Sequence, residues 1–114
     1  LEFATEVSGA RAIVVLGHNA CGAIMGAVDG VKLGHITALL ENFDPALVTI
    51  DASDGPRASS NDKLVQKVTE ANVRLTAAGL TSRSPILARR VEAGTLRIVP
   101  AMHDLATGRV SWLS

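Results

Sequence analysis

The chain has 114 residues with eleven basic and eleven acidic side chains, and this formal charge of zero gives no electrostatic footprint for nucleic acid or an anionic membrane. With an apolar fraction of 47% and no run near the roughly 20 apolar residues of a membrane span, residues 1–114 predict a single domain with one core. The only cysteine excludes an internal disulfide and favours a reducing compartment, the cytoplasm first, although the compartment stays open.

The first half of the chain predicts a helix, a strand and two further helices. Residues 1–9 have helical spacing, and the apolar run that Gly17 closes is typical of a strand buried on both faces of a parallel sheet. Small side chains over residues 20–28 indicate a closely packed helix after a turn. Residues 34–45 predict another helix, which Pro45 ends. Its apolar face consists of Ile36, Leu39, Leu40 and Phe43.

A polar stretch separates these elements from a long predicted helix. Residues 51–60 are rich in turn formers, which indicates a flexible surface connection. Ser60 or Asn61 can cap the helix that follows, and we expect this helix to end near Gly79. Its apolar stripe consists of Leu64, Val68, Ala71 and Leu75.

The last third predicts a helix and two strands. Ser84 is a cap followed by Pro85 at the first helical position, and Gly94 stops the helix. Residues 95–102 predict a buried strand, and residues 109–113 predict a partly solvated edge strand after a turn. The order of elements therefore predicts an α/β fold, with a mostly parallel β-sheet flanked by helices and an antiparallel terminal edge strand.

One short segment carries the candidate chemistry. His18 follows the predicted strand, at the carboxyl end where open α/β sheets place their ligands, and Cys21 lies three residues later in the first turn of a helix. The positive end of the helix dipole favours a thiolate there, so His18 and Cys21 together make half of a zinc site. On spacing alone, a small buried cysteine and a hydrogen-bonded structural histidine are the commoner interpretation.

Longer stretches resemble the β-class carbonic anhydrases. The segment Ala12-Ile-Val-Val-Leu-Gly-His18-Asn-Ala-Cys21-Gly-Ala is similar to that family's second metal motif, a Gly-His-x-x-Cys-Gly after an apolar strand. The stretches Glu70-Ala-Asn-Val-Arg-Leu and Gly94-Thr-Leu-Arg-Ile-Val resemble a later helix and strand of the family, and residues 101–113 resemble its terminal hairpin. The resemblance covers nearly the whole chain, apart from residues around 44 to 60.

The sequence departs from this family at one motif. Members carry a Cys-x-Asp-x-Arg motif on an earlier strand, which supplies a second zinc thiolate and an Asp-Arg pair, and this motif does not occur here. Because Cys21 is the sole cysteine, this chain cannot complete the family's Cys-His-Cys ligand set. Leu1 lies inside a helical pattern with no capping residue before it, so we expect that an amino-terminal segment carrying the motif is missing.

The resemblance implies the activity of a carbonic anhydrase, or carbonate dehydratase, which is a lyase that reversibly hydrates carbon dioxide to bicarbonate. We expect this activity to require the missing amino-terminal segment. The resemblance also implies that His18 and Cys21 bind Zn²⁺, that the backbone at Gly22 lines the metal pocket, and that the protein forms a homodimer or homotetramer. Its partners would be carbon dioxide and bicarbonate, with no nucleic acid and no membrane.

Two other functions remain open at the level of sequence. The same fold and metal could support a hydrolase of carbonyl sulfide or carbon disulfide, which differs in a pocket width that sequence does not give. The chain could also be a non-catalytic zinc-binding or scaffold module, in which His18 and Cys21 hold no metal or join a partner chain's pair. Among the remaining candidates, we interpret His35 as a surface residue and Asp104 as a turn residue, and His103 could move protons.

Overall fold

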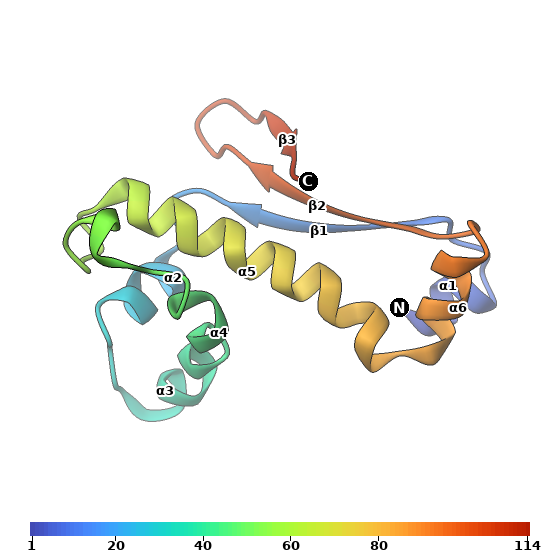
Figure 1. The fold of residues 1–114 in the computed structure, drawn as a ribbon, viewed down its shortest axis with the longest axis horizontal. Coiled ribbons are helices and arrows are strands. Elements are labelled where there is room, and N and C mark those ends of the chain that lie inside the picture. Colours follow the sequence, from blue (N-terminus) through green and yellow to red (C-terminus); the bar gives the residue numbers. More distant parts are fainter.

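The computed structural model describes residues 1–114 as a small sheet with helices packed against it (Figure 1). In chain order the elements are α1 (Glu2–Glu6), β1 (Ala12–His18), α2 (Gly22–Val28), α3 (Gly34–Glu41), α4 (Asp44–Leu47), a 3₁₀ turn η1 (Ala52–Asp54), α5 (Asp62–Arg83), α6 (Pro85–Glu92), β2 (Arg97–His103) and β3 (Val110–Trp112). This order confirms the expected α/β class. None of the helices combines the length and the hydropathy that a membrane span requires.

The three strands lie in the order β1-β2-β3. β1 and β2 run parallel, in a register that sets His18 opposite His103 at their carboxyl ends. β3 is antiparallel to β2, with Trp112 opposite Ala101, so the expected antiparallel terminal edge strand is confirmed. β1 forms the other edge of the sheet, and within residues 1–114 no strand pairs with its outer side.

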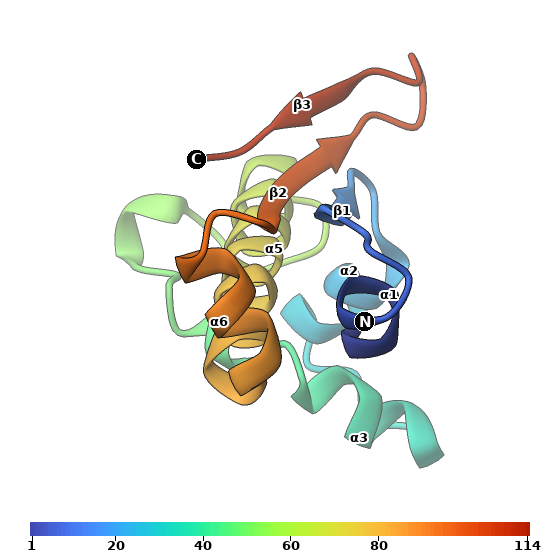
Figure 2. The same cartoon turned by 90° about the vertical axis from the view of Figure 1, so that its right-hand side faces the viewer.

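The two faces of the sheet differ in how well they are covered. The helices gather on one side of the strands in both views, and α5 packs against β1 and β2 (Figures 1 and 2). Along β1, Ile13 on the covered face is 9% exposed, whereas Val14 and Leu16 on the other face are 47% and 51% exposed. The prediction that both faces of this strand are buried is therefore wrong for these residues, because nothing packs on the second face.

Side-chain caps fix the amino-terminal ends of α5 and α6. The Asn61 side chain accepts a hydrogen bond from the Leu64 backbone N–H at 3.3 Å, and Ser84 does the same for Leu87 at 3.3 Å. These caps confirm the predictions at Asn61 and Ser84. The predicted end near Gly79 is wrong, because α5 continues to Arg83. A single helical glycine costs only about 1 kcal/mol, and the stronger stop comes where Pro85 restricts the residue before it.

Two further predictions about helices need correction. The predicted helix at 34–45 is divided into α3 and α4, and Pro45 lies in the first turn of α4 instead of ending a helix. On α3 only Leu40 is buried, while Ile36 and Leu39 are exposed because no other element covers them. On α5 the buried row runs through Val73 rather than the predicted Leu75, since Val73 is on the side that faces the sheet.

The core consists of two apolar clusters, one at each end of α5. The larger is formed by Ile24, Val28, Ala46, Leu64, Val65 and Val68, and the smaller by Ile13, Leu87 and Leu96. Cys21 and Met25 pack against the larger cluster, so the turn after β1 rests on this core. The predicted loop at 51–60 is exposed, but it contains η1, and the Lys67 ammonium pairs with the Asp54 carboxylate at 2.6 Å.

Candidate metal centre

The turn between β1 and α2 carries both predicted metal ligands. His18 is the last residue of β1, and Cys21 is the N-cap residue of α2. Only Asn19 and Ala20 separate them, so the strand and the helix bring both side chains to one edge of the sheet. The carboxyl ends of parallel strands are where open α/β sheets bind their ligands. The structure therefore places His18 where the sequence predicted it, and Cys21 one residue before the first turn of α2.

The ring of His18 is oriented by its own turn. Its Nδ1 lies 2.8 Å from the backbone carbonyl oxygen of Asn19. Because a carbonyl oxygen only accepts hydrogen bonds, Nδ1 is the donor, and in the neutral ring the lone pair is then on Nε2. Histidines that bind metals use this arrangement, in which one ring nitrogen is held by a hydrogen bond and the other is free to coordinate.

Asn19 joins the turn to the end of β2. Its backbone N–H donates to the His103 carbonyl oxygen at 3.2 Å, and its side-chain Oδ1 accepts from the Leu105 N–H at 2.9 Å. These two bonds cross 84 and 86 residues of sequence, so they fix the His18 turn against the strand beside it. Asn19 was not among the residues singled out from sequence. The only sequence signal is that asparagine is a frequent turn residue, which says nothing of a partner so far along the chain.

Ala20 holds the turn in an uncommon conformation. It is the only non-glycine residue with a positive φ, at 49°. For an L-residue with a Cβ this left-handed conformation costs about 1–2 kcal/mol relative to the right-handed one. Strained backbone of this kind is frequent at functional sites, where the surrounding structure holds it in place. The one strained residue thus lies between the two candidate ligands.

Cys21 and Gly22 occupy the start of α2. Cys21 is a free cysteine that is half-buried, with its backbone extended at φ −72° and ψ 113°. Gly22 is exposed, and a Cβ built on it would meet no heavy atom within 4 Å. The packing of these 114 residues therefore does not require glycine at position 22. Any requirement for glycine there must come from a group that uses the open space.

His18 and Cys21 are side chains of the types that bind zinc, but a zinc site needs more ligands than these two. Imidazole nitrogen and thiolate sulfur are ordinary zinc ligands, and the tautomer of His18 is the right one. Catalytic zinc sites use three protein ligands and structural sites use four. No group of three or more His, Cys, Asp or Glu side chains could hold a metal ion in this chain. His18 and Cys21 can thus be at most part of a zinc site, and further donors must lie outside these residues.

The other titratable candidates divide between surface and turn. His35 is exposed on α3, as expected. The carboxylate of Asp104 accepts hydrogen bonds from the backbone N–H groups of Thr107 at 3.0 Å and Ala106 at 2.8 Å. Those two bonds, the Thr107 one first, hold the pKa of Asp104 below its ordinary value of 3.8. This confirms Asp104 as a turn residue, while His103 is half-buried beside the His18 turn.

Comparisons with known proteins extend these observations. The family model described as carbonic anhydrase matches residues 1–110. The chain is 32% identical over 114 residues to carbonic anhydrase 2 of Mycobacterium tuberculosis (strain CDC 1551 / Oshkosh), covering 96% of this chain and 52% of that protein. It is 30% identical over 115 residues to the carbonic anhydrase of Mycolicibacterium smegmatis, again over 96% and 52%. The chain thus spans about half the length of the curated relatives it matches.

Solved structures of β-carbonic anhydrases have a similar fold. A tetrameric β-carbonic anhydrase from Sordaria macrospora superposes with a TM-score of 0.83 at 23% identity, over 99% of this chain and 57% of that one. The Coccomyxa β-carbonic anhydrase, solved in complex with acetazolamide, superposes with a TM-score of 0.81 at 23% identity, over 98% and 50%. With the family match over residues 1–110, the chain belongs to the carbonic anhydrase family and has the fold of its β class.

Proposed function

We propose that the protein catalyses the zinc-dependent reversible hydration of carbon dioxide to bicarbonate, with His18 and Cys21 as two of the zinc ligands. The observation that carries this proposal is the bond from His18 Nδ1 to the Asn19 carbonyl, which leaves Nε2 free three residues before a free cysteine. The similar proteins of Mycobacterium tuberculosis and Mycolicibacterium smegmatis, both described as carbonic anhydrases, support the same reaction. When bound, zinc supplies the Lewis acidity that makes water a nucleophile near neutral pH.

The remaining ligands are proposed to come from a strand outside these residues. β1 lies at the edge of the sheet, and its outer side has unpaired backbone N–H and C=O groups. A strand that added to this side in parallel would end beside His18, where it could bring a further thiolate to the same metal. The Cys-x-Asp-x-Arg motif that the family resemblance implies would fill this role. We therefore assign the segment carrying this motif to the open edge of β1.

The residues of this chain would orient the site rather than complete it. His18 would bind through Nε2, with Nδ1 held by the turn, and Asn19 would keep that turn against β2. Gly22 would leave room beside the metal, because its missing Cβ faces open space in the described chain. Carbon dioxide is small and uncharged, so it needs little more than a dry pocket beside the activated water.

We further propose that the protein works as a homodimer or homotetramer in the cytoplasm, with a small-molecule substrate and neither nucleic acid nor membrane as a partner. Large apolar side chains on the sheet remain exposed in the single chain, with Leu16 at 51% and Trp112 at 67%. Exposed apolar surface of this kind marks sites of protein association. One similar structure is described as a tetrameric enzyme, which supports an oligomer of the same kind.

The proposal is tested by zinc content and carbon dioxide hydration, measured together on the full-length protein. We expect His18→Ala and Cys21→Ser each to lower bound zinc and to reduce the hydration rate by more than about 100-fold, since even second-shell changes at zinc sites cost about 10–100-fold. His35→Ala is the matched control, because His35 is exposed on α3 and should leave both readouts unchanged. Full zinc content in both ligand variants would contradict the assignment and favour a scaffold role.

A further inference from the structure

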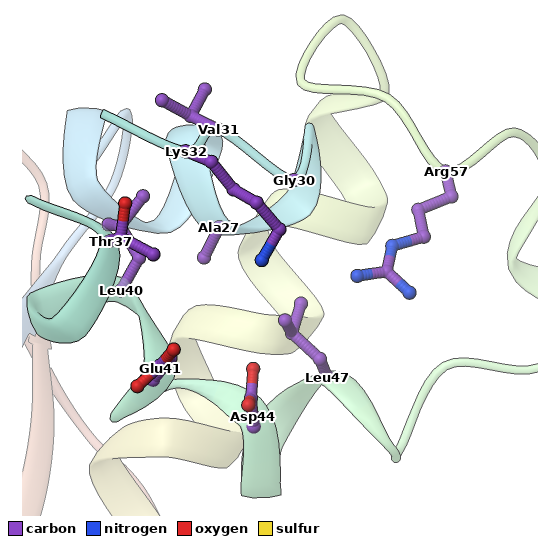
Figure 3. Close-up of a pocket in the computed structure, with 10 residues that line it drawn as sticks. All are labelled: Ala27, Gly30, Val31, Lys32, Thr37, Leu40, Glu41, Asp44, Leu47 and Arg57. Atoms are coloured by element: carbon purple, nitrogen blue, oxygen red, sulfur yellow. The ribbon is translucent and has the colours of Figure 1, made fainter. Parts of the chain in front are cut away.

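A cavity of about 310 Å³ lies at the carboxyl-terminal end of α2 (Figure 3). Cys21, at the other end of α2, does not line it. Its volume is at the lower end of the range of small-molecule sites. The walls come from the segment after α2, from α3 and α4, and from the loop before α5 (Figure 3). Since the seven residues of α2 span roughly 10 Å, the cavity is separate from the His18 turn.

Charges of both signs line this cavity without pairing with one another. Lys32 and Arg57 supply two cations, and Glu41 and Asp44 supply two carboxylates on another wall (Figure 3). The ion pairs of the chain involve other residues, so none of these four charges is neutralised by a neighbour. All four side chains are exposed, and opposite charges on the walls of one cavity match a ligand that carries both charges.

Arg57 is held so that its guanidinium is available to a ligand. Its Nε donates to the backbone carbonyl oxygen of Val28 at 3.2 Å, a bond that joins the loop before α5 to the end of α2. The two terminal nitrogens of Arg57 have no partner in the chain, and in Figure 3 they extend toward the cavity. The planar fork of an arginine matches a carboxylate in bidentate geometry.

The rest of the cavity wall is apolar. Ala27 and Leu40 are 5% and 6% exposed and contribute the wall between the charged groups, and Leu47 extends it from α4. A simple anion would be attracted by the two cations but repelled by the two carboxylates. A simple cation would be attracted by the carboxylates but repelled by Lys32 and Arg57. A ligand with one positive charge, one negative charge and a short apolar group could pair with the carboxylates, pair with the cations and contact the apolar side chains.

We propose that this cavity binds a small α-amino acid with a short apolar side chain. The carboxylate of the ligand lies against Arg57 and Lys32, and its ammonium group lies against Glu41 and Asp44. The side chain of the ligand contacts the apolar wall around Leu40. This site is independent of the proposed carbon dioxide chemistry, because it lies at the opposite end of α2 from Cys21.

The test is a titration of the full-length protein with L-alanine, followed by NMR of the backbone amides and by calorimetry. We expect saturable shifts at Gly30 and Val31, which line the cavity, and none at Cys21. Propionate and ethylamine, which each lack one of the two charges, should bind at least about tenfold more weakly. Equal binding of L-alanine and propionate, shifts centred on Cys21, or no saturable shift would each overturn the proposal.

Single variants test the contribution of the cations and of the carboxylates separately. We expect Arg57→Gln and Glu41→Gln each to weaken L-alanine binding on the order of tenfold. Because Arg57 also bonds the Val28 carbonyl, Glu41→Gln keeps the test valid if the loop moves in the arginine variant. Glu92→Gln, on the exposed end of α6, is the matched control and should bind L-alanine as the unchanged protein does. An unchanged affinity in Glu41→Gln would show that the carboxylates take no part.

Discussion

The two faces of the sheet differ in how far residues 1–114 cover them. On the covered face, Ile13 is nearly fully buried with Leu87 of α6 and Leu96, and Gly17 lies against α5. On the other face, Leu16 is half exposed, and His18 follows it on the same side of the strand two residues later. Residues 1–114 therefore bury the first face, whereas the face with the candidate ligand stays partly exposed in the single chain.

This difference separates the residues that stabilise the fold from those proposed to bind metal and partner subunits. The covered face depends on apolar contacts that this chain supplies by itself. The candidate metal centre offers two donors where a zinc site requires at least three, and it adjoins an unpaired strand edge and an uncovered face. The covered face should therefore respond to substitution through stability, and the open face through metal binding and association.

The largest expected effect on stability lies on the covered face. Leu87 is 2% exposed, so Leu87→Ala should lower the free energy of unfolding of the full-length protein by about 2–5 kcal/mol through the cavity it leaves. Leu16→Ala removes the same atoms from a side chain that is 51% exposed in the single chain, and should cost the dissociated subunit about 1 kcal/mol or less. Urea unfolding at equilibrium measures both. Equal losses would show that the open face is packed as tightly as the covered one, which would remove the difference between them.

A pair of glycines on either side of His18 gives the next test. A Cβ on Gly17 would collide with Val73 Cγ2 and lie 2.8 Å from the Met102 sulfur, so Gly17→Ala should cost about 1–3 kcal/mol of stability. Gly22→Ala meets no atom within 4 Å and should change the free energy of unfolding by about 0.5 kcal/mol or less.

Gly22→Ala should affect activity more than stability, the reverse of what Gly17→Ala does to stability. We expect Gly22→Ala to slow carbon dioxide hydration more than it affects stability, because its methyl group would enter the space proposed beside the metal. Thermal unfolding and hydration rates on the same preparations separate the two effects. A stability loss in Gly22→Ala as large as that in Gly17→Ala would mean that position 22 is packed in the full-length protein.

What the sequence could predict was mostly what depends on neighbours along the chain. The caps at Asn61 and Ser84 are bonds to a residue three positions later, so local sequence is sufficient to find them. The His18–Cys21 pair lies within one strand-turn-helix unit and is equally local. The end of α5 was misplaced at Gly79, since a glycine inside a helix is a weaker signal than the proline that follows it.

What the sequence could not predict depends on partners far along the chain or outside it. The burial of both faces of β1 was expected from its apolar run, but burial depends on what packs above each face, and Val14 has nothing above it. The role of Asn19 depends on Leu105, 86 residues away, which no spacing rule connects to it. The count of zinc donors shows the same limit, because His18 and Cys21 are only two donors and no third side chain of this chain joins them.

A substitution of Asn19 is expected to have a smaller effect on stability and a separate effect on zinc binding. Asn19→Ala removes the acceptor for the Leu105 N–H and should cost about 0.5–1.5 kcal/mol of stability. Because the bond fixes the His18 turn, we also expect zinc affinity to fall by about 10-fold or more, as it does when second-shell partners are removed. Competition with a chelator measures the affinity, and Asn42→Ala, at the C-cap of α3 and away from the His18 turn, is the control. Unchanged zinc affinity in Asn19→Ala would show that the turn does not position the ligand.

The smallest effect is expected at Asp104, in the turn that precedes β3. Its folded-state pKa is held below 3.8 by the N–H groups of Thr107 and Ala106, so the ionised carboxylate stabilises the folded state. This contribution is complete above the unfolded pKa and is lost as the pH falls through the lower folded pKa. Asp104→Asn should therefore unfold at a lower temperature than the unchanged protein near neutral pH, and the gap should close as the pH falls below 3.8. Glu92→Gln controls for the change in net charge, and a gap independent of pH would mean that the ionised carboxylate does not hold this turn.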